Sequence, residues 1–459
     1  MKLNRNVFRE YDIRGKYGLE IDEDLFCHIG KALGTIYRKR NLSKIVLGMD
    51  CRLSSESLAR ELSNGLLSTG CNVAFVGHVP YPMIHFLTTT GGFEGGVYVT
   101  ASHNTKEYNG VKQEYAGAEP IYGESIQEVA NLIEKENYAV GAGAFSEENL
   151  EDLYVSFIAK CFRFRKNHRV VLNGGNGVAG GVALKILNKL NVEVVPVNVE
   201  SDGSFPNGTP DTEDEGFMHQ TSEAVKKHGV DAGFGLDGDG DRFLMVDEKG
   251  VPHTTDRSLL LFSKYILEQN PGSKIAYDVK CTSLAEEMIR KFGGEPIMMK
   301  TGRSLFIKMM TAKEALFGVE FSGHTYFADK YFGYDDGIYA ICRTLEILDR
   351  ERNSLSYLMS EFPKMVSSPE IKVPCSDDLK FSIVEKIVEQ VTESNRFSKK
   401  SFIDGVRANV SDTGWFLIRA KNTSPFLGIR AEAADEEELK EVLNEVEALL
   451  LPYGLNLRG

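Results

Sequence analysis

Lys44-Ile45-Val46-Leu47-Gly48-Met49-Asp50 is an apolar run that ends on a carboxylate, and a helical pattern follows it from Ser55 to Leu67. A short apolar run before a helical pattern is typical of a buried strand in an α/β unit. The same order of run, loop and helical pattern recurs at 169–173 before 182–187, and at 274–278 before 284–292. This repetition predicts three topologically similar α/β domains with mainly parallel or mixed sheets.

The pattern changes in the last fifth of the chain. Pro363, Pro369 and Pro374 predict a linker over residues 363–374. Beyond it, short strand patterns at 405–410, 414–420 and 427–432 lie between helical patterns at 379–391 and 436–450. A chain of 459 residues is too long for one core, so we expect a C-terminal α+β domain after the three α/β domains. The expected boundaries are 1–146, 147–251, 252–366 and 367–459.

Composition restricts where the protein works and what it binds. No apolar run approaches the roughly 18–20 residues that span a bilayer, and residues 1–6 lack the apolar core of a signal peptide. The seven cysteines are scattered and form no C-x-x-C pair, so we expect neither disulfides nor a zinc site, and a cytoplasmic location. The net charge of −13 argues against a nucleic-acid partner. We expect no membrane partner, and the sequence leaves a monomer or a weak oligomer open.

A serine follows the apolar strand pattern 96–99, in the stretch Thr100-Ala101-Ser102-His103-Asn104. This setting lets the hydroxyl of Ser102 project from a strand end, where it could act as a nucleophile or carry a phosphoryl group; the alternative is an ordinary turn serine. Side chains of adjacent residues diverge in extended backbone, so Ser102 and His103 do not predict a hydrolase dyad.

Three carboxylates alternate with glycine in Asp237-Gly238-Asp239-Gly240-Asp241-Arg242. Positions i, i+2 and i+4 of an extended chain point to one side, and three like charges held together require a cation. Oxygen ligands favour Mg²⁺ or Ca²⁺. The sequence does not fit a calcium EF-hand loop, because Arg242 stands where that loop requires glycine and the flanks have strand patterns. We expect Mg²⁺, with a solvated acidic turn as the alternative.

A glycine-rich turn supports a rival function. Gly175-Asn176-Gly177-Val178-Ala179-Gly180 matches G-x-G-x-x-G, and Glu200 follows at the spacing of a dinucleotide-binding fingerprint. A nicotinamide oxidoreductase is therefore an alternative, although it would leave the serine loop and the Asp triplet unused. The purely structural alternative is a tight strand-to-helix turn that binds no ligand.

Two further loops have the composition of recognition elements. Glu320-Phe321-Ser322-Gly323-His324 combines an acceptor, a hydroxyl and an imidazole. This set can bind sugar hydroxyls; the alternative is a polar turn with no ligand. The loop 419–425, with Arg430 beyond it, combines cations, an amide and hydroxyls. Such donors bind phosphate, and a solvated basic turn is the alternative.

Together these loops resemble the α-D-phosphohexomutase family, in particular its bacterial phosphomannomutase/phosphoglucomutase branch. The resemblance spans nearly the whole chain, through residues 8–15, 100–112, 237–242, 300–305, 320–324, 332–337 and 422–425. It implies three similar α/β domains and a C-terminal domain, each of which contributes one loop to a central cleft.

The resemblance also implies roles for single residues. Ser102 would be the phosphorylated serine, and Asp237, Asp239 and Asp241 would hold Mg²⁺ together with a phosphoryl oxygen on Ser102. The other catalytic positions would be His103, Asn104, Lys112 and Arg242, with Lys112 as proton acceptor from the sugar. Glu320, Ser322 and His324 would bind the sugar. The non-reacting phosphate would meet Arg419, Lys421, Asn422, Thr423 and Arg430. Further cleft positions would be Arg14, Tyr17, Lys280 and Arg303.

The implied reaction converts a hexose 6-phosphate to the 1-phosphate through a hexose 1,6-bisphosphate, which is also the activator. The chain departs from the family pattern at Thr105, Arg303 and Lys421, where proline, histidine and serine are usual. Phe321 stands where glucosamine-phosphate mutases carry glutamine, which favours mannose and glucose phosphates. A phosphoglucosamine mutase and a catalytically silent sugar-phosphate-binding protein are the remaining alternatives.

Overall fold

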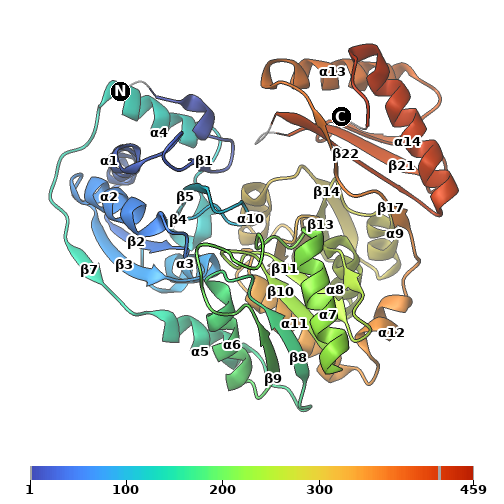
Figure 1. Ribbon diagram of the computed structural model, residues 1–459, viewed down its shortest axis with the longest axis horizontal. Coiled ribbons are helices and arrows are strands. Elements are labelled where there is room, and N and C mark those ends of the chain that lie inside the picture. The colour runs from blue at the N-terminus through green and yellow to red at the C-terminus, as the bar shows by residue number, and fades with distance from the viewer. Residues whose placement is uncertain (1–2, 422–424, 458–459) are drawn as a thin grey trace.

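The computed structural model describes residues 3–421 and 425–457, which form four sheets in succession along the chain (Figure 1). The first sheet has the order β1-β5-β4-β2-β3-β7, with β6 paired to β5. Its strands are β1 (Ile13–Lys16), β2 (Lys44–Met49), β3 (Asn72–His78), β4 (Gly95–Val99), β5 (Tyr108–Tyr115), β6 (Glu119–Pro120) and β7 (Phe145–Glu147). Its helices are α1 (Glu23–Lys39), α2 (Ser55–Leu67), α3 (Tyr81–Thr90) and α4 (Glu124–Lys135).

The second and third sheets repeat the mixture of parallel and antiparallel pairs. The second has the order β12-β11-β10-β8-β9 and the third the order β14-β13-β15-β16. The elements of the second are α5 (Glu151–Cys161), β8 (Arg169–Asn173), α6 (Ala179–Lys189), β9 (Glu193–Val197), α7 (Glu215–His228), β10 (Ala232–Leu236), β11 (Phe243–Asp247) and β12 (Pro252–His253). Those of the third are α8 (Thr255–Gln269), β13 (Lys274–Asp278), α9 (Leu284–Lys291), β14 (Glu295–Met299), α10 (Arg303–Thr311), β15 (Phe317–Val319), β16 (Thr325–Phe327), α11 (Gly337–Arg350) and α12 (Leu355–Ser360).

The fourth sheet is antiparallel throughout and has the order β17-β22-β21-β20-β19, with β18 also paired to β22. Its elements are β17 (Val366–Ser367), β18 (Ile371–Pro374), α13 (Asp377–Glu393), β19 (Ser398–Ser401), β20 (Val406–Asn409), β21 (Trp415–Ala420), β22 (Phe426–Ala433) and α14 (Glu436–Leu450). The prediction of three α/β domains followed by an α+β domain is confirmed.

The prediction of a linker over 363–374 is wrong in part. Both β17 and β18 lie in this segment and pair with the edge of the fourth sheet along β22. Pro369 separates these two short strands, and Pro374 ends the second. Proline lacks the amide that a central strand must donate, but an edge strand tolerates it. The prolines therefore mark an edge strand that is broken into two pieces.

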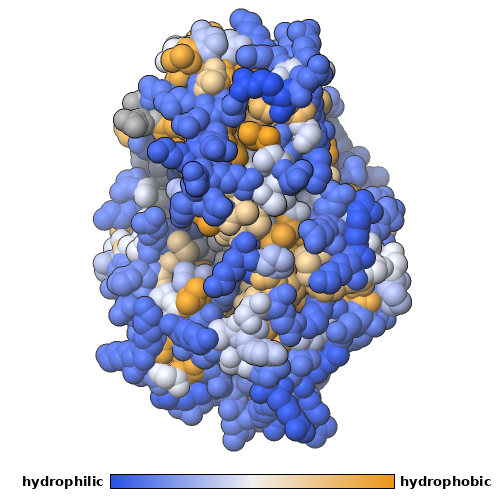
Figure 2. Space-filling view, turned by 90° about the vertical axis from the view of Figure 1, so that its right-hand side faces the viewer, coloured by the Kyte–Doolittle hydropathy of each residue, from blue (hydrophilic) through white to orange (hydrophobic). Residues whose placement is uncertain are grey.

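The packing of the four units is unequal. One continuous apolar core runs from the first sheet through the second and third, and contains Tyr98, Phe234 and Phe317. The C-terminal sheet has a separate core, and a small cluster of Val279, Trp415 and Leu417 joins it to the third sheet. The C-terminal unit lies at the upper right of Figure 1, beside the third. The face in Figure 2 is mostly hydrophilic, and its apolar side chains form small groups.

Among the described residues, no helix is both long enough and apolar enough to cross a membrane.

The end of one strand in each sheet leads into a candidate loop. Ser102 follows β4, Asp237 follows β10, Glu320 follows β15 and Lys421 follows β21. In open α/β sheets, ligands bind beyond the carboxyl ends of the strands. The topology that the first three sheets share therefore places three of these loops at corresponding strand ends, and the antiparallel fourth sheet supplies the last loop.

Close packing of α1 on α2 requires two glycines. A Cβ atom at Gly30 would lie 2.2 Å from the Leu62 carbonyl oxygen, and one at Gly65 would lie 2.2 Å from the Cys27 carbonyl oxygen. We expect Gly30→Ala or Gly65→Ala to destabilise the protein by about 1–3 kcal/mol, because the helices must separate. Thermal unfolding measures this effect.

Gly181→Ala is the matched control, because a Cβ at this helical position would have no atom of the other described segments within 4 Å. It should leave the unfolding midpoint unchanged or raise it, since alanine favours a helix by roughly 1 kcal/mol over glycine. Equal destabilisation by all three substitutions would contradict the packing argument.

Candidate active site

Ser102 is buried at the end of the first sheet. Its backbone is left-handed, with φ of +49°, and its amide donates to Thr100 Oγ1 at 2.7 Å. Its hydroxyl donates to Asp237 Oδ2 at 2.9 Å, so the serine loop and the Asp loop meet directly. Gly238 permits this approach, since a Cβ there would lie 2.6 Å from the Ser102 carbonyl oxygen.

The expectation that the Ser102 and His103 side chains diverge is wrong. Ser102 Oγ lies 3.3 Å from His103 Nδ1. The expectation assumed an extended backbone, and the left-handed conformation of Ser102 turns both side chains the same way. Burial, with the nearby charges of Arg242 and Arg14, lowers the pKa of His103 well below its usual value. A neutral imidazole therefore lies beside the hydroxyl.

Sequence reasoning missed Arg52, which holds the serine loop in place. Its guanidinium is fully buried and donates to the carbonyl oxygens of Ser102 (2.8 Å), Asn104 (2.6 Å), Thr105 (2.6 Å) and Tyr108 (3.0 Å). Asp50 Oδ2 accepts from Arg52 Nε at 3.0 Å and from Thr100 Oγ1 at 2.8 Å. The available signal was the Asp50-Cys51-Arg52 sequence directly after the first buried strand.

The Asp triplet converges in a turn, as predicted. Asp237, Asp239 and Asp241 are fully buried, and one carboxylate oxygen of each lies within 4.8 Å of the others. The chain bends at Gly240, where φ is +80°. Asp237 Oδ1 accepts from the amides of Gly240 and Arg242 at 3.0 and 3.1 Å. The loop joins β10 and β11, which pair antiparallel, so its flanks are strands rather than EF-hand helices.

Lys112 of β5 reaches across from the first sheet to two of these carboxylates. Its Nζ lies 2.8 Å from Asp239 Oδ2 and 2.6 Å from Asp241 Oδ2. Burial opposes the ammonium form, but the two carboxylates outweigh it and raise the pKa of Lys112. Burial would also raise the pKa of Asp241, yet the charge of Lys112 lowers it to about 2.

The remaining atoms of the triplet fit a divalent cation. Asp239 Oδ1 and Asp241 Oδ1 are buried and accept no hydrogen bond from any described residue. Burial and the charges of Asp241 and Asp239 raise the pKa of Asp237 well above its usual value, so the cluster is short of positive charge. Carboxylate oxygens are the ligands of Mg²⁺, and the residues present fit that ion.

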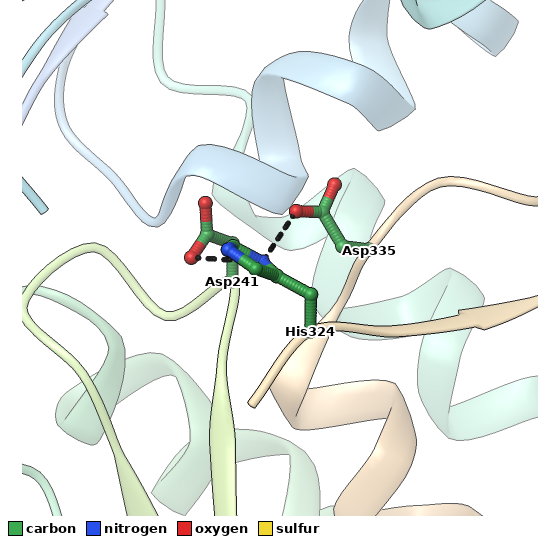
Figure 3. Close-up of side chains that lie close together, drawn as sticks. All are labelled: Asp241, His324 and Asp335. Atoms are coloured by element: carbon green, nitrogen blue, oxygen red, sulfur yellow. Dashed lines mark ion pairs between the residues drawn. The ribbon is translucent and has the colours of Figure 1, made fainter. Parts of the chain in front are cut away.

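His324 joins the Asp loop to the third sheet. Its Nδ1 lies 2.8 Å from Asp335 Oδ2 and 3.5 Å from Asp241 Oδ1 (Figure 3). Arg242 Nε donates to its Nε2 at 3.1 Å. The Asp241, His324 and Asp335 group also has the spacing of a metal site. Arg303 Nε already lies 2.7 Å from Asp335 Oδ2 and 3.8 Å from Asp241 Oδ2, so this group has its own cation.

Arg303 connects the three α/β units at this point. Besides Asp335, its guanidinium reaches His85 Nε2 of α3 at 2.8 Å and lies 4.6 Å from the centre of the Tyr81 ring. His85 Nδ1 in turn lies 2.6 Å from Glu114 Oε2 of β5. His85 and Glu114 are buried residues that sequence reasoning missed, and their positions carry no motif signal.

The Glu320 loop forms a tight turn in which the Glu320 amide donates to the His324 carbonyl at 3.0 Å. Glu320 is buried, and its two carboxylate oxygens accept from the Gly302 amide and from Tyr326 Oη, both at 2.7 Å. Ser322 is half-buried in the same turn. The structure thus brings together Glu320, Ser322 and His324.

The cations of the 419–425 loop have carboxylate partners from their own domain. Arg419 Nε lies 2.9 Å from Asp404 Oδ2, and Lys421 Nζ lies 2.6 Å from Glu370 Oε2. Asn422 and Thr423 lie outside the described residues. Arg430 has different surroundings: it is buried, donates to the Lys280 carbonyl and pairs with Asp256 Oδ2 at 3.1 Å.

Of the other expected cleft positions, Arg14 and Lys280 lie beside the candidate loops, and Tyr17 lies on the surface. Arg14 donates to Asn104 Oδ1 at 2.8 Å, which places it at the serine loop. Lys280 Nζ lies 5.3 Å from the centre of the Phe321 ring, beside the Glu320 loop. Tyr17 is 41% exposed and donates to Glu23 Oε1 at 2.6 Å on the surface of the first unit.

The glycine-rich turn 175–180 packs against the Asp loop. A Cβ atom at Gly177 would lie 2.5 Å from the Gly238 carbonyl oxygen, which also accepts from the Val178 amide at 3.1 Å. In a dinucleotide site, this close approach would serve the pyrophosphate. In this protein, the backbone of the Asp loop occupies the space that a pyrophosphate would need.

We expect Arg303→Leu to destabilise the protein by about 3–5 kcal/mol, because it leaves Asp335 buried with less compensating charge. Chemical denaturation measures the loss. Arg60→Leu removes an arginine whose side chain is 70% exposed and should change stability by at most about 0.5 kcal/mol. Indistinguishable stabilities of the two variants would show that Arg303 does not hold the units together.

Comparisons with known proteins agree with this geometry. Phosphoglucomutase/phosphomannomutase family models match the chain as alpha/beta/alpha domains I, II and III at residues 5–139, 152–250 and 254–366, and as the C-terminal domain at 370–449. A Pseudomonas aeruginosa phosphomannomutase/phosphoglucomutase is 38% identical over 96% of this chain and 94% of its own. A Neisseria gonorrhoeae phosphoglucomutase is 34% identical over 98% and 97%.

A solved structure gives the same result. The Burkholderia thailandensis phosphoglucomutase/phosphomannomutase family protein superposes with a TM-score of 0.91 at 33% identity, covering 98% of this chain and 97% of that one. Matches of this length and identity, over all four domains, extend beyond a shared fold. The chain therefore belongs to the phosphoglucomutase/phosphomannomutase family of phosphohexomutases.

Proposed function

We propose that the enzyme interconverts hexose 6-phosphates and hexose 1-phosphates through a phosphoserine at Ser102 and a hexose 1,6-bisphosphate. The observation that carries this proposal is the contact between the Ser102 hydroxyl and Asp237 Oδ2 inside the carboxylate cluster. A phosphoryl group on Ser102 would stand at the point where the serine loop and the Asp loop meet. Domains 1–146, 147–251, 252–366 and 367–459 would each contribute one loop to the reaction.

Asp237, Asp239 and Asp241 would hold Mg²⁺, which neutralises charge on a phosphoryl group in transfer. In the transfer itself, a sugar hydroxyl oxygen bonds to phosphorus while the bond from phosphorus to Ser102 Oγ breaks. The sugar hydroxyl gives its proton to a base, and Ser102 Oγ, which leaves with the electrons of the broken bond, takes up a proton to become the serine hydroxyl. Lys112 is a cation while Asp239 and Asp241 hold it, so its expected role as proton acceptor requires its release from these carboxylates.

Arg242 would stabilise the phosphoryl oxygens electrostatically, and His103 and Asn104 would lie around them. Arg242 is well placed because Asp237 and His324 fix its backbone amide and its side chain. Arg303, held by Asp335 and His85, would position His324 indirectly through their shared carboxylate.

The sugar and the non-reacting phosphate would lie between the third and fourth domains. Glu320 and Ser322 would accept and donate hydrogen bonds to sugar hydroxyls, since each carboxylate oxygen can accept a second bond. Arg419, Lys421, Asn422 and Thr423 would bind the phosphate, with Lys280 beside them. We propose a supporting role for Arg430, whose guanidinium lies 3.7 Å from the centre of the Phe321 ring and stiffens the sugar loop.

Mannose and glucose phosphates are the proposed substrates. Phe321 is packed between Arg430 and Lys280 and offers the sugar loop no amide for an amino sugar. Glucosamine phosphate is the alternative substrate. A silent sugar-phosphate-binding protein would have no use for the fully buried Asp triplet beside Ser102.

Purified protein given Mg²⁺ and a trace of glucose 1,6-bisphosphate should convert glucose 1-phosphate or mannose 1-phosphate faster than glucosamine 1-phosphate. Ser102→Ala should lower the rate by about 10³-fold or more, because it removes the phosphoryl carrier. Ser382→Ala, on the exposed face of α13, is the control. Full activity of Ser102→Ala would refute the phosphoserine, and preference for glucosamine phosphate would favour the alternative substrate.

Metal binding should be visible without turnover. Mg²⁺ at 100 times its dissociation constant should stabilise the folded protein by about 2.7 kcal/mol, because only the folded chain assembles the triplet. Differential scanning fluorimetry after EDTA treatment and Mg²⁺ addition measures this shift. Asp239→Asn should abolish it, whereas Asp378→Asn, at an exposed site on α13, should not. An equal shift in both variants would place the metal elsewhere.

A further inference from the structure

Lys421 and Glu370 form an ion pair at the edge of the phosphate loop. Lys421 Nζ lies 2.6 Å from Glu370 Oε2, and the side chains are 20% and 11% exposed. Lys421 follows β21, and Glu370 precedes β18. Gly428 of β22 leaves room for the pair, since a Cβ there would lie 2.9 Å from Glu370 Oε1 and 3.5 Å from Lys421 Cε.

Glu370 is the anion of a cationic cluster. Burial opposes its ionisation, but Lys280 and Lys421, with a smaller contribution from Arg419, lower the pKa of Glu370 to about 2. Burial and the neighbouring charge of Lys280 lower the pKa of Lys421, although Glu370 counteracts this. The second oxygen of Glu370, Oε1, is buried and accepts no hydrogen bond from residues 3–421 or 425–457. One carboxylate thus faces the cations on which the proposed phosphate site depends.

We propose that Glu370 acts as an internal anion that competes with the non-reacting phosphate of the substrate for the ammonium group of Lys421. This inference rests on the proposed function, in which Lys421 is a phosphate ligand. The carboxylate and the phosphate present the same chemistry to Lys421, namely negatively charged oxygens. Glu370 therefore keeps the loop neutral when no substrate is bound, and it lowers the affinity of the loop for phosphate.

Competition and a supporting role predict opposite effects of removing the charge of Glu370. If Glu370 only held Lys421 in place for the phosphate, removal of its charge would weaken substrate binding. If Glu370 competes, Glu370→Gln preserves the shape of the side chain, frees Lys421 and tightens binding. We expect the KM for glucose 1-phosphate and the inhibition constant of inorganic phosphate to fall by roughly 3- to 10-fold, the effect of one partly exposed ion pair.

The experiment compares full-length wild-type protein, Glu370→Gln, Lys421→Met and the double variant. Steady-state kinetics gives KM and kcat for glucose 1-phosphate, and isothermal titration calorimetry gives the dissociation constant of the same ligand. Lys421→Met should weaken binding, and it should reduce the gain from Glu370→Gln because the contested ammonium group is gone. Glu389→Gln, on the exposed part of α13, removes an equal charge and should change neither constant.

Unchanged or weaker binding by Glu370→Gln, in a protein that retains turnover, would overturn the competition and leave the mutase function intact. The same gain in Glu389→Gln would attribute the effect to net charge and would also overturn it. A wild-type protein that neither binds nor converts hexose phosphates would instead refute the proposed function, and with it this inference. Lys421→Met keeps the test decisive if Glu370→Gln folds poorly, because phosphate affinity that is insensitive to Lys421 contradicts the proposal.

Discussion

The burial of three carboxylates in one turn is the constraint on which the rest of this structure depends. Asp237, Asp239 and Asp241 are fully buried, and like charges at this distance repel strongly in a medium of low polarity. The turn is stable only because cations from other domains approach it. Lys112 comes from the first domain, and Arg303 comes from the third. The carboxylate cluster and the contacts between the domains are therefore the same set of interactions.

The serine loop shows how the fold supports this centre. Arg52 gathers four carbonyl oxygens of the loop, and Asp50 holds Arg52. A continuous apolar core through the first three domains fixes the position of the serine loop relative to the Asp loop. The C-terminal domain has a core of its own, and its cations Arg419 and Lys421 pair with Asp404 and Glu370. The molecule thus combines a buried carboxylate cluster among the first three domains with a C-terminal domain in which Arg419 and Lys421 each have a carboxylate partner.

Local patterns predicted the elements well and some contacts poorly. The strand at 274–278 and the helix at 55–67 have the predicted bounds, because the first is a short apolar run and the second has a helical hydrophobic period. The linker predicted over 363–374 is wrong in part, since this segment contains two short strands that pair with β22 and that Pro369 separates. The divergence expected of Ser102 and His103 failed because Ser102 is left-handed. In both places a general rule did not hold, because an edge strand tolerates proline and because the backbone of Ser102 is not extended.

The sequence by itself determined the repeated α/β order, the alternation of aspartate and glycine, and the position of the serine loop after a strand. These features are local, and adjacent residues define them. Only the tertiary structure decided which cations meet which carboxylates. Lys112 with Asp239, His85 with Glu114, and Lys421 with Glu370 pair across 127, 29 and 51 residues of sequence. No periodicity connects such positions, because their proximity results from the packing of whole sheets and from the need to neutralise buried charge.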